Sequence, residues 1–211
     1  MTVDINKKPI FTKSGIFNTG KTIATANTAK DGIGTVVTVF DAQRAASTLT
    51  SSSTTATYTS ADPHGFLNGE QILVSGVAEA GYNGIQTITV TGPRVFTYTV
   101  ASGLTTPATG TIVADPINGC RIEKLVFQPL GTNIATVARA FLNNGQASTT
   151  AANNTYLDDV TLPASTLSEA AIMAGVEMLL DIVVPPFYKI NVTVGTTVVA
   201  GYAVHAVAGA Y

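Results

Sequence analysis

The chain of 211 residues contains little of the chemistry that most enzymes and metalloproteins need, with one cysteine, two histidines and no tryptophan. Its 11 basic and 13 acidic residues make up only 11% of the chain, against roughly 25% in an ordinary soluble domain. A single cysteine excludes an internal disulfide. The net charge of −2 provides no strong attraction to nucleic acid. We therefore expect no nucleic-acid partner, no metal or other cofactor, and no enzymatic activity.

The sequence also lacks a long, continuous apolar run. Residues 190–211 carry no formal charge, but glycine and polar residues interrupt them repeatedly, whereas a spanning helix needs about 20 predominantly apolar residues. This alternation is typical of strands. The first 11 residues have no apolar core of the kind found in secretory signals. We expect no membrane association.

Residues that favour strands are abundant. The chain has 33 threonines, and threonine, valine and isoleucine are enriched in β-sheets. The sequence therefore predicts an all-β protein. With so few charges, we expect other copies of the chain or other proteins to cover much of its surface. The alternative is a threonine-rich β protein that is soluble as a monomer.

Alternating segments near both ends predict a jelly-roll-like β-sandwich body. One segment within it is ambiguous, because residues 165–180 fit a helix only partly. The alternative there is a short helical turn followed by a strand over 177–184. The remaining predicted strands of the body are 35–40, 121–127, 135–142, 156–162, 188–194 and 197–207.

A second unit is predicted within this body. Five short strands, separated by turns such as Asp62-Pro63-His64-Gly65, lie between residues 56 and 114 and predict a small β barrel or sandwich. The uncharged stretch 45–61 is rich in Ser, Thr and Ala, which is typical of a linker or a loosely formed strand edge. The predicted division is an N-terminal arm (1–20), a discontinuous β-sandwich body (21–49 and 116–211) and an inserted small β domain (50–115).

The N-terminal segment is the most basic part of the chain. Residues 1–30 contain five lysines and a single aspartate. We expect this arm to dock on an acidic neighbouring protein, and the alternative is a loosely packed terminus. The candidate partner-binding residues are Lys7, Lys8, Phe11, Lys13 and Phe17.

Histidine and cysteine are residue types often used in catalysis, but the two histidines and the one cysteine of this chain are each better explained without a catalytic role. His64 lies in a turn and His205 in an alternating apolar strand, with no His or Cys cluster to complete a metal site. Both are interpreted as structural or interface histidines. Cys120 is predicted to be a small buried apolar group.

The carboxylates do not suggest a catalytic pair either. Asp158 and Asp159 are adjacent, so on a strand their side chains point to opposite faces. Glu177 and Asp181 would share a helical face, where like charges indicate exposure. A glycosidase needs two carboxylates across a cleft, so this class is not favoured.

Short motifs within residues 50–115 resemble a small β module of tailed-bacteriophage virion proteins. Flanking segments are similar to phage structural proteins, including head-decoration (cement) subunits. The motifs of the module are His64-Gly65-Phe66, Asn68-Gly69-Glu70, Val74-Ser75-Gly76, Tyr82-Asn83-Gly84 and Phe96-Thr97-Tyr98-Thr99-Val100, and the flanking ones are 28–40, 121–125, 141–145, 161–163 and 187–193.

This resemblance implies a structural protein on the surface of a phage particle, made in the host cytoplasm. Its expected partners are the major capsid protein and further copies of itself, as a homotrimer. Its function would be to clamp and stabilise the capsid shell. A tail, baseplate or fibre component is the alternative, and an enzyme acting on host glycans is the third hypothesis.

Overall fold

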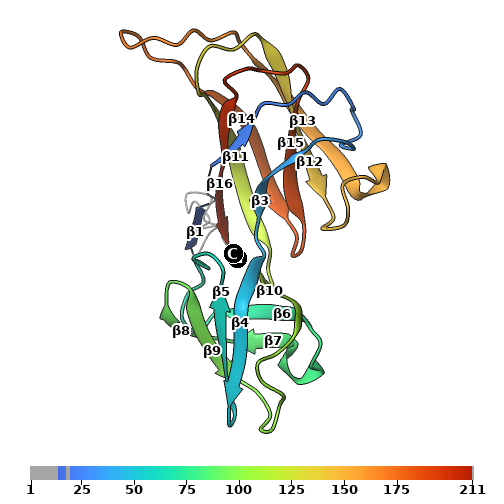
Figure 1. The fold of residues 1–211 in the computed structure, drawn as a ribbon, viewed down its shortest axis with the longest axis vertical. Coiled ribbons are helices and arrows are strands. Elements are labelled where there is room, and N and C mark those ends of the chain that lie inside the picture. Colours follow the sequence, from blue (N-terminus) through green and yellow to red (C-terminus); the bar gives the residue numbers. More distant parts are fainter. Residues whose placement is uncertain (1–13, 18–19, 211) are drawn as a thin grey trace, which may run out of the picture.

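The computed structural model describes residues 14–17 and 20–210, and its elements are almost entirely strands (Figure 1). All named strand pairs are antiparallel. Within the described residues, helical structure is limited to two 3-10 turns, η1 (Ala80–Tyr82) and η2 (Ala151–Asn153). The prediction of an all-β fold is confirmed.

Two sheets packed face to face form the larger lobe. The first contains, in spatial order, β2 (Lys21–Ile23), β16 (Tyr202–Ala210), β11 (Cys120–Pro129) and β14 (Val176–Val184), with β1 (Ser14–Phe17) also paired to β16. The second contains β13 (Asn154–Leu162), β12 (Thr136–Asn143), β15 (Lys189–Val194) and β3 (Val37–Asp41).

The strand order identifies this lobe as a jelly roll. When only the strands from β2 to β16 that belong to these two sheets are counted, the first sheet has the order 1-8-3-6 and the second 2-7-4-5. Successive strands therefore alternate between the two sheets, except for β12 and β13, which are neighbours in the second sheet, and this is the arrangement of a double Greek key. The prediction of a jelly-roll-like sandwich is confirmed.

Apolar side chains from both sheets fill the space between them. Phe40, Phe127 and Tyr202 are essentially inaccessible to solvent, together with Ile122 and Leu125. Each such side chain stabilises the fold by roughly 1.5–3 kcal/mol through burial. Alternation along the strands, with inward residues apolar, is what gives the sandwich its core.

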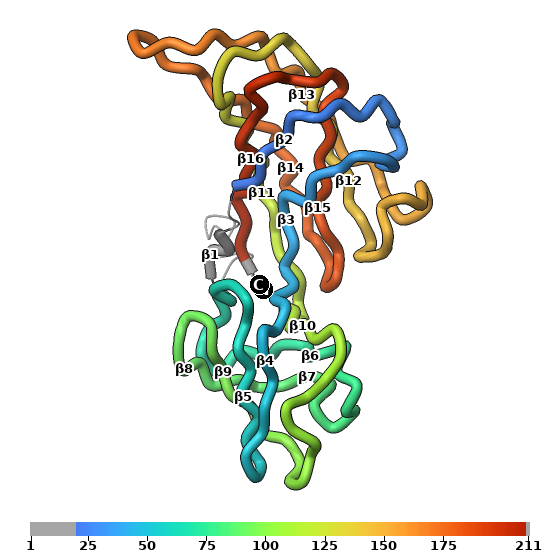
Figure 2. Tube along the Cα trace, in the orientation of Figure 1, coloured from blue at the N-terminus to red at the C-terminus, as the bar shows by residue number. Residues whose placement is uncertain are grey.

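The smaller lobe is one nearly closed sheet with a core of its own. In the chain it lies between β3 and β11, and Figures 1 and 2 show it at one end of the jelly roll. Tyr58 and Phe96 stack at its centre, with ring centroids 4.6 Å apart. Its strands, in spatial order, are β7 (Gly84–Thr87), β6 (Gln71–Val77), β10 (Gly110–Pro116), β4 (Arg44–Ser52), β5 (Thr55–Ser60), β9 (Val95–Thr99) and β8 (Thr89–Gly92).

The stretch 45–61 is neither a linker nor a loose edge, and that prediction is wrong. It forms the β4–β5 hairpin in the middle of the small sheet, which begins at Arg44 rather than at residue 50. Threonine fits a pleated sheet well, and Ser47 donates a cross-strand hydrogen bond to the Thr59 carbonyl. A composition typical of a linker therefore coincides with a central hairpin.

Residues 165–180 do not form a helix, and that prediction is also wrong. Residues 165–175 form a loop, and Val176–Val184 is β14, so the alternative with a strand over 177–184 was closer. Ser168 accepts hydrogen bonds from the amides of Ala170 and Ala171, as an N-cap would, but no helix continues from this turn. The chain instead continues as a loop into β14, which pairs with β11.

A pair of glycines in the small lobe allows a clean test of its packing. Gly76 and Gly69 both have positive φ, but a Cβ at Gly76 would overlap the carbonyl oxygen of Thr111, whereas a Cβ at Gly69 would meet nothing within 4 Å. We expect Gly69→Ala to cost about 1 kcal/mol of stability through backbone strain alone. Gly76→Ala should cost about 3 kcal/mol or more, because β6 and β10 must separate. Urea unfolding of both variants measures the difference, and equal losses would contradict the proposed clash.

Candidate interaction surface

Three loops meet at the end of the jelly roll that lies away from the small lobe (Figure 1). We call residues 130–135, 163–175 and 195–201 the apical loops. Ile172 and Val199 are 95% and 94% exposed, and three further apolar side chains on these loops are about half exposed, namely Leu130, Ile134 and Leu167. Apolar side chains so fully exposed mark a candidate protein-binding surface.

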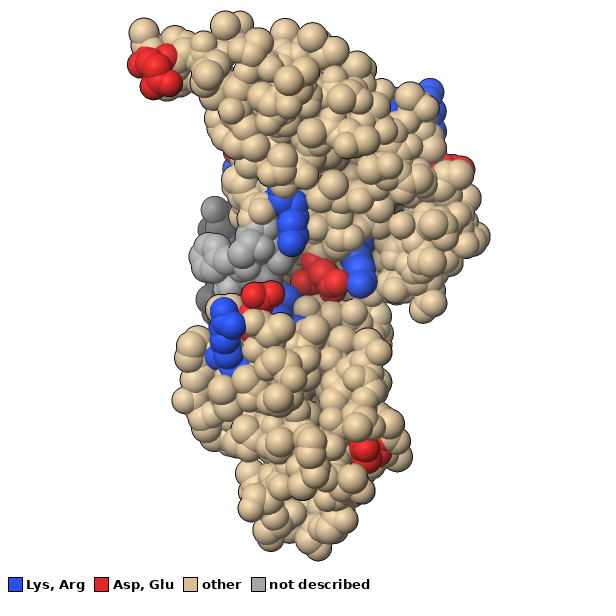
Figure 3. Space-filling model, in the orientation of Figure 1, with Lys and Arg blue, Asp and Glu red and all other residues tan. Residues whose placement is uncertain are grey.

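Charge is almost absent from the apical loops. Glu169 is the only charged residue in their sequence. In Figure 3 the apex shows almost no basic or acidic side chains, whereas such side chains gather at the waist between the lobes. When a partner covers the apex, few charged side chains of the apical loops lose their contact with water. This favours an apolar contact.

Asn133 holds two of the apical loops together. Its side chain is 4% exposed, and its Oδ1 accepts hydrogen bonds from the amides of Ala200 (2.9 Å) and Gly201 (3.1 Å). Its Nδ2 donates to the Gly201 carbonyl at 2.9 Å. One amide side chain thus satisfies backbone groups 67 and 68 residues away in the chain.

The third loop is attached to the first through backbone and hydroxyl groups. The amide and carbonyl of Asn133 pair with those of Ser165 at 3.0 and 2.9 Å. The Ser165 hydroxyl donates to the Gly131 carbonyl at 2.7 Å, and the Leu167 amide donates to Thr132 Oγ1 at 2.9 Å. The apical loops are therefore ordered before a partner arrives, which lowers the entropic cost of binding.

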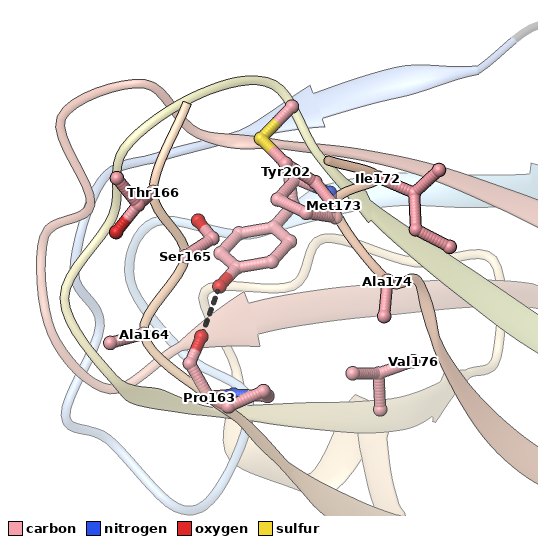
Figure 4. Close-up of a pocket in the computed structure, with 10 residues that line it drawn as sticks. Pro163, Ala164, Ser165, Thr166, Ile172, Met173, Ala174, Val176 and Tyr202 are labelled. Atoms are coloured by element: carbon pink, nitrogen blue, oxygen red, sulfur yellow. Dashed lines mark hydrogen bonds between the residues drawn. The ribbon is translucent and has the colours of Figure 1, made fainter. Parts of the chain in front are cut away.

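A pocket of about 190 Å³ opens beneath the longest apical loop (Figure 4). Tyr202 lies in it, and its hydroxyl donates a hydrogen bond to the Pro163 carbonyl at 3.0 Å. Ile172, Met173 and Val176 contribute apolar walls. The pocket could accept one apolar side chain of a partner, and it contains no titratable group other than the tyrosine.

The structure describes only one of the five residues predicted to form the partner-binding arm. Lys7, Lys8, Phe11 and Lys13 lie outside the described residues. Phe17 is the last residue of β1 and pairs with Val207 of β16. The arm prediction stays a prediction.

His64 and Cys120 have the environments expected of structural residues. His64 Nδ1 accepts the Phe66 amide, while Nε2 lies 3.0 Å from the Gly92 carbonyl, and burial lowers the pKa of this ring. Because Nδ1 accepts this hydrogen bond, the proton of the ring lies on Nε2. His205 is exposed on β16. Cys120 is buried, as predicted, and burial raises the pKa of its thiol to about 12.

The carboxylates singled out in the sequence are all exposed. Asp158 and Asp159 lie side by side on the edge strand β13. Glu177 and Asp181 lie on β14, not on a helix. They form ion pairs with Lys124, at 2.6 Å, and with Arg121. Across residues 14–17 and 20–210, no group of three or more His, Cys, Asp or Glu side chains is arranged to hold a metal ion.

No protein-family model, curated protein or solved structure matches this chain. None of the helices in the described part is long and apolar enough to cross a membrane. Sequence reasoning misses the apical surface because residues 165–180 are interpreted either as a helix or as a helical turn followed by a strand, and residues 197–207 as a strand. The available signal is the lack of charge in residues 163–175, where Glu169 is the one charged residue.

The structure predicts that Asn133 is essential for the shape of the apex. Asn133→Ala leaves the Ala200 and Gly201 amides without their acceptor, so we expect a loss of about 3 kcal/mol in unfolding free energy. The matched control is Asn68→Ala, because exposed Asn68 accepts a single bond from the Val90 amide. Its loss should stay below about 1 kcal/mol. Thermal or urea unfolding compares the two, and a smaller loss for Asn133→Ala than for the control would contradict the role assigned to this side chain.

Proposed function

We propose that this protein is a non-enzymatic structural component of a tailed-phage particle, and that it decorates the head by binding major capsid subunits. The apolar, ordered apical loops are the observation that carries the proposal. The resemblance of its short motifs to phage virion proteins supplies the class of particle.

The apical loops suit permanent attachment to a protein shell. Ile172 and Val199 lose nearly all of their exposed area if a partner covers them, and apolar area contributes roughly 25 cal/mol per Å² when it leaves water. The hydrogen bonds of Asn133 already fix the loops, so little conformational entropy is lost on binding. An apolar contact region on the capsid subunit is the matching partner surface.

Self-association into a trimer is part of the same proposal. A homotrimer would present three apical surfaces to neighbouring capsid subunits at once. Contacts that are individually weak then become strong in combination, because the second and third contacts form at high effective concentration. The small lobe, at the other end of the jelly roll (Figure 2), would face away from the shell in this arrangement.

Charge placed at the apex tests the proposal directly. The double variant Ile172→Asp and Val199→Asp should bind expanded heads of the encoding phage at least about tenfold more weakly, because two carboxylates lose hydration at the contact. Ile85→Asp is the matched control, since Ile85 is a 61% exposed residue of the small lobe. Co-sedimentation with purified heads measures binding. Equal binding of both variants would overturn the apical contact, and labelled protein found only on tails would overturn the head assignment.

The arm is tested separately by a truncation that keeps β1. Deleting residues 1–13 removes Lys7, Lys8, Phe11 and Lys13 but preserves the pairing of Ser14–Phe17 with β16. We expect an unchanged unfolding temperature and several-fold weaker attachment to heads, with stronger salt dependence in the full chain. Undiminished attachment of the truncated chain would contradict a role for the arm, whereas the apical contact would still stand.

A further inference from the structure

A charged junction joins the two lobes. The chain passes from the jelly roll to the small lobe between β3 and β4, and returns between β10 and β11. Asp41, Arg44, Asp115 and Cys120 lie at the ends of these four strands. Figure 3 shows charged side chains gathered at this waist. Groups at such a place can control how the lobes are held together.

Two basic residues of the junction, Arg44 and Lys189, already have partners. Arg44 donates through Nη1 to the Asp41 and Gln43 carbonyls, at 2.8 and 3.0 Å, and through Nε to the His64 carbonyl at 3.3 Å. Lys189 Nζ lies 2.9 Å from Asp41 Oδ2. Neither cation forms an ion pair with Asp115 in the structure.

Asp115 connects the lobes through a single hydrogen bond. It belongs to β10 of the small lobe, and its Oδ2 accepts the amide of Phe187, 2.8 Å away in the loop between β14 and β15 of the jelly roll. The residue is 0% exposed, and Oδ1 has no hydrogen-bond partner among the described residues. A charged oxygen in this position is costly, and a neutral hydroxyl is much less so.

The surroundings of Asp115 favour its neutral form. The pKa of its carboxyl is raised to about 6, mainly by burial and also by Asp41 on β3, whereas the Phe187 amide, the Gln43 side chain and Arg44 on β4 act to lower it. On β11, Cys120 has a thiol pKa of about 12, so it is uncharged at neutral pH. Lys189 on β15 is paired with Asp41, and Glu70, before β6, acts on Cys120.

We propose that Asp115 and the Phe187 amide form a proton-controlled latch between the two lobes, closed when Asp115 is neutral and open to water when it is ionised. When the neutral Asp115 side chain is buried in the closed junction, the only group left without a hydrogen-bond partner is its carboxyl hydroxyl. Ionisation leaves a buried charge, which is relieved when the junction separates and water reaches Oδ1. Opening breaks the one hydrogen bond from this side chain that joins the lobes.

The direction of the pH effect follows from the sign of the shift. The carboxyl pKa in the folded protein, about 6, is above its ordinary value of 3.8. The folded, closed state therefore binds the proton more tightly than the open or unfolded state. Its stabilisation is complete below pH 3.8 and is lost as the pH rises through 6, so the latch holds in mild acid and loosens at neutral pH.

Two measurements on the full chain test the latch. The Asp115 ¹³Cγ resonance should titrate at a pH of about 6. Over the same interval the exchange rate of the Phe187 amide, corrected for the intrinsic pH dependence of exchange, should rise by about tenfold or more as the junction opens. Asp115→Asn keeps a carbonyl acceptor for Phe187 but cannot ionise, so its corrected exchange should lose the step. Asp62→Asn, an exposed neighbour of Arg44, should retain the wild-type step.

The proposal is overturned by any of three results. These are a carboxyl that titrates near pH 4, a Phe187 exchange rate without a step, or a step that persists in Asp115→Asn. If the asparagine variant does not fold, the titration and exchange of the wild-type chain still decide the matter. Binding to heads plays no part in these measurements, so the latch and the proposed function are tested independently.

Discussion

The alternation of side chains along β11 is the constraint on which the rest of the structure depends. This strand pairs with both β14 and β16, and its inward residues Ile122, Leu125 and Phe127 are fully buried. The alternation changes phase at a register shift between Ile122 and Lys124, which keeps apolar groups inside on both sides of it. A one-residue slip elsewhere would turn the apolar set toward solvent.

Because β11 spans the whole lobe, it also connects the junction to the apical loops. It begins at Cys120 in the junction and ends at Pro129, which lines the apical pocket. The sparse charges are distributed in keeping with this layout. Ion pairs join β11 to β14 on the outer face, further charges occupy the waist, and the apical loops have a single acidic residue. Solubility is thus provided away from the surface proposed to bind a partner.

The strands could be predicted from sequence because their signal is local. Alternation places β9 and β12 within about two residues of their observed bounds, and the turn residues Asp62-Pro63-His64-Gly65 correctly separate β5 from β6. The β4–β5 hairpin and the loop before β14 were assigned wrongly, because Ser/Thr composition and one partial helical pattern do not distinguish the states that tertiary pairing selects.

The apical surface and the junction could not be predicted from the sequence, because they depend on contacts between distant segments. Asn133 is an ordinary polar residue until the chain brings Gly201 against it, 68 residues later. Asp115 in the sequence Asp-Pro indicated a boundary, but its burial and its bond to Phe187, 72 residues away, follow only from the fold.

The apical loops and the junction are expected to respond differently to pH, so the two proposals can be considered separately. The hydrogen bonds of the apical loops come from Asn133, Ser165 and Thr132, which do not titrate between pH 4 and 8. The apical surface therefore keeps its shape while the latch at Asp115 changes state. If the proposed attachment to a shell is correct, an effect of pH should act through the position of the small lobe and leave the apical contact unchanged.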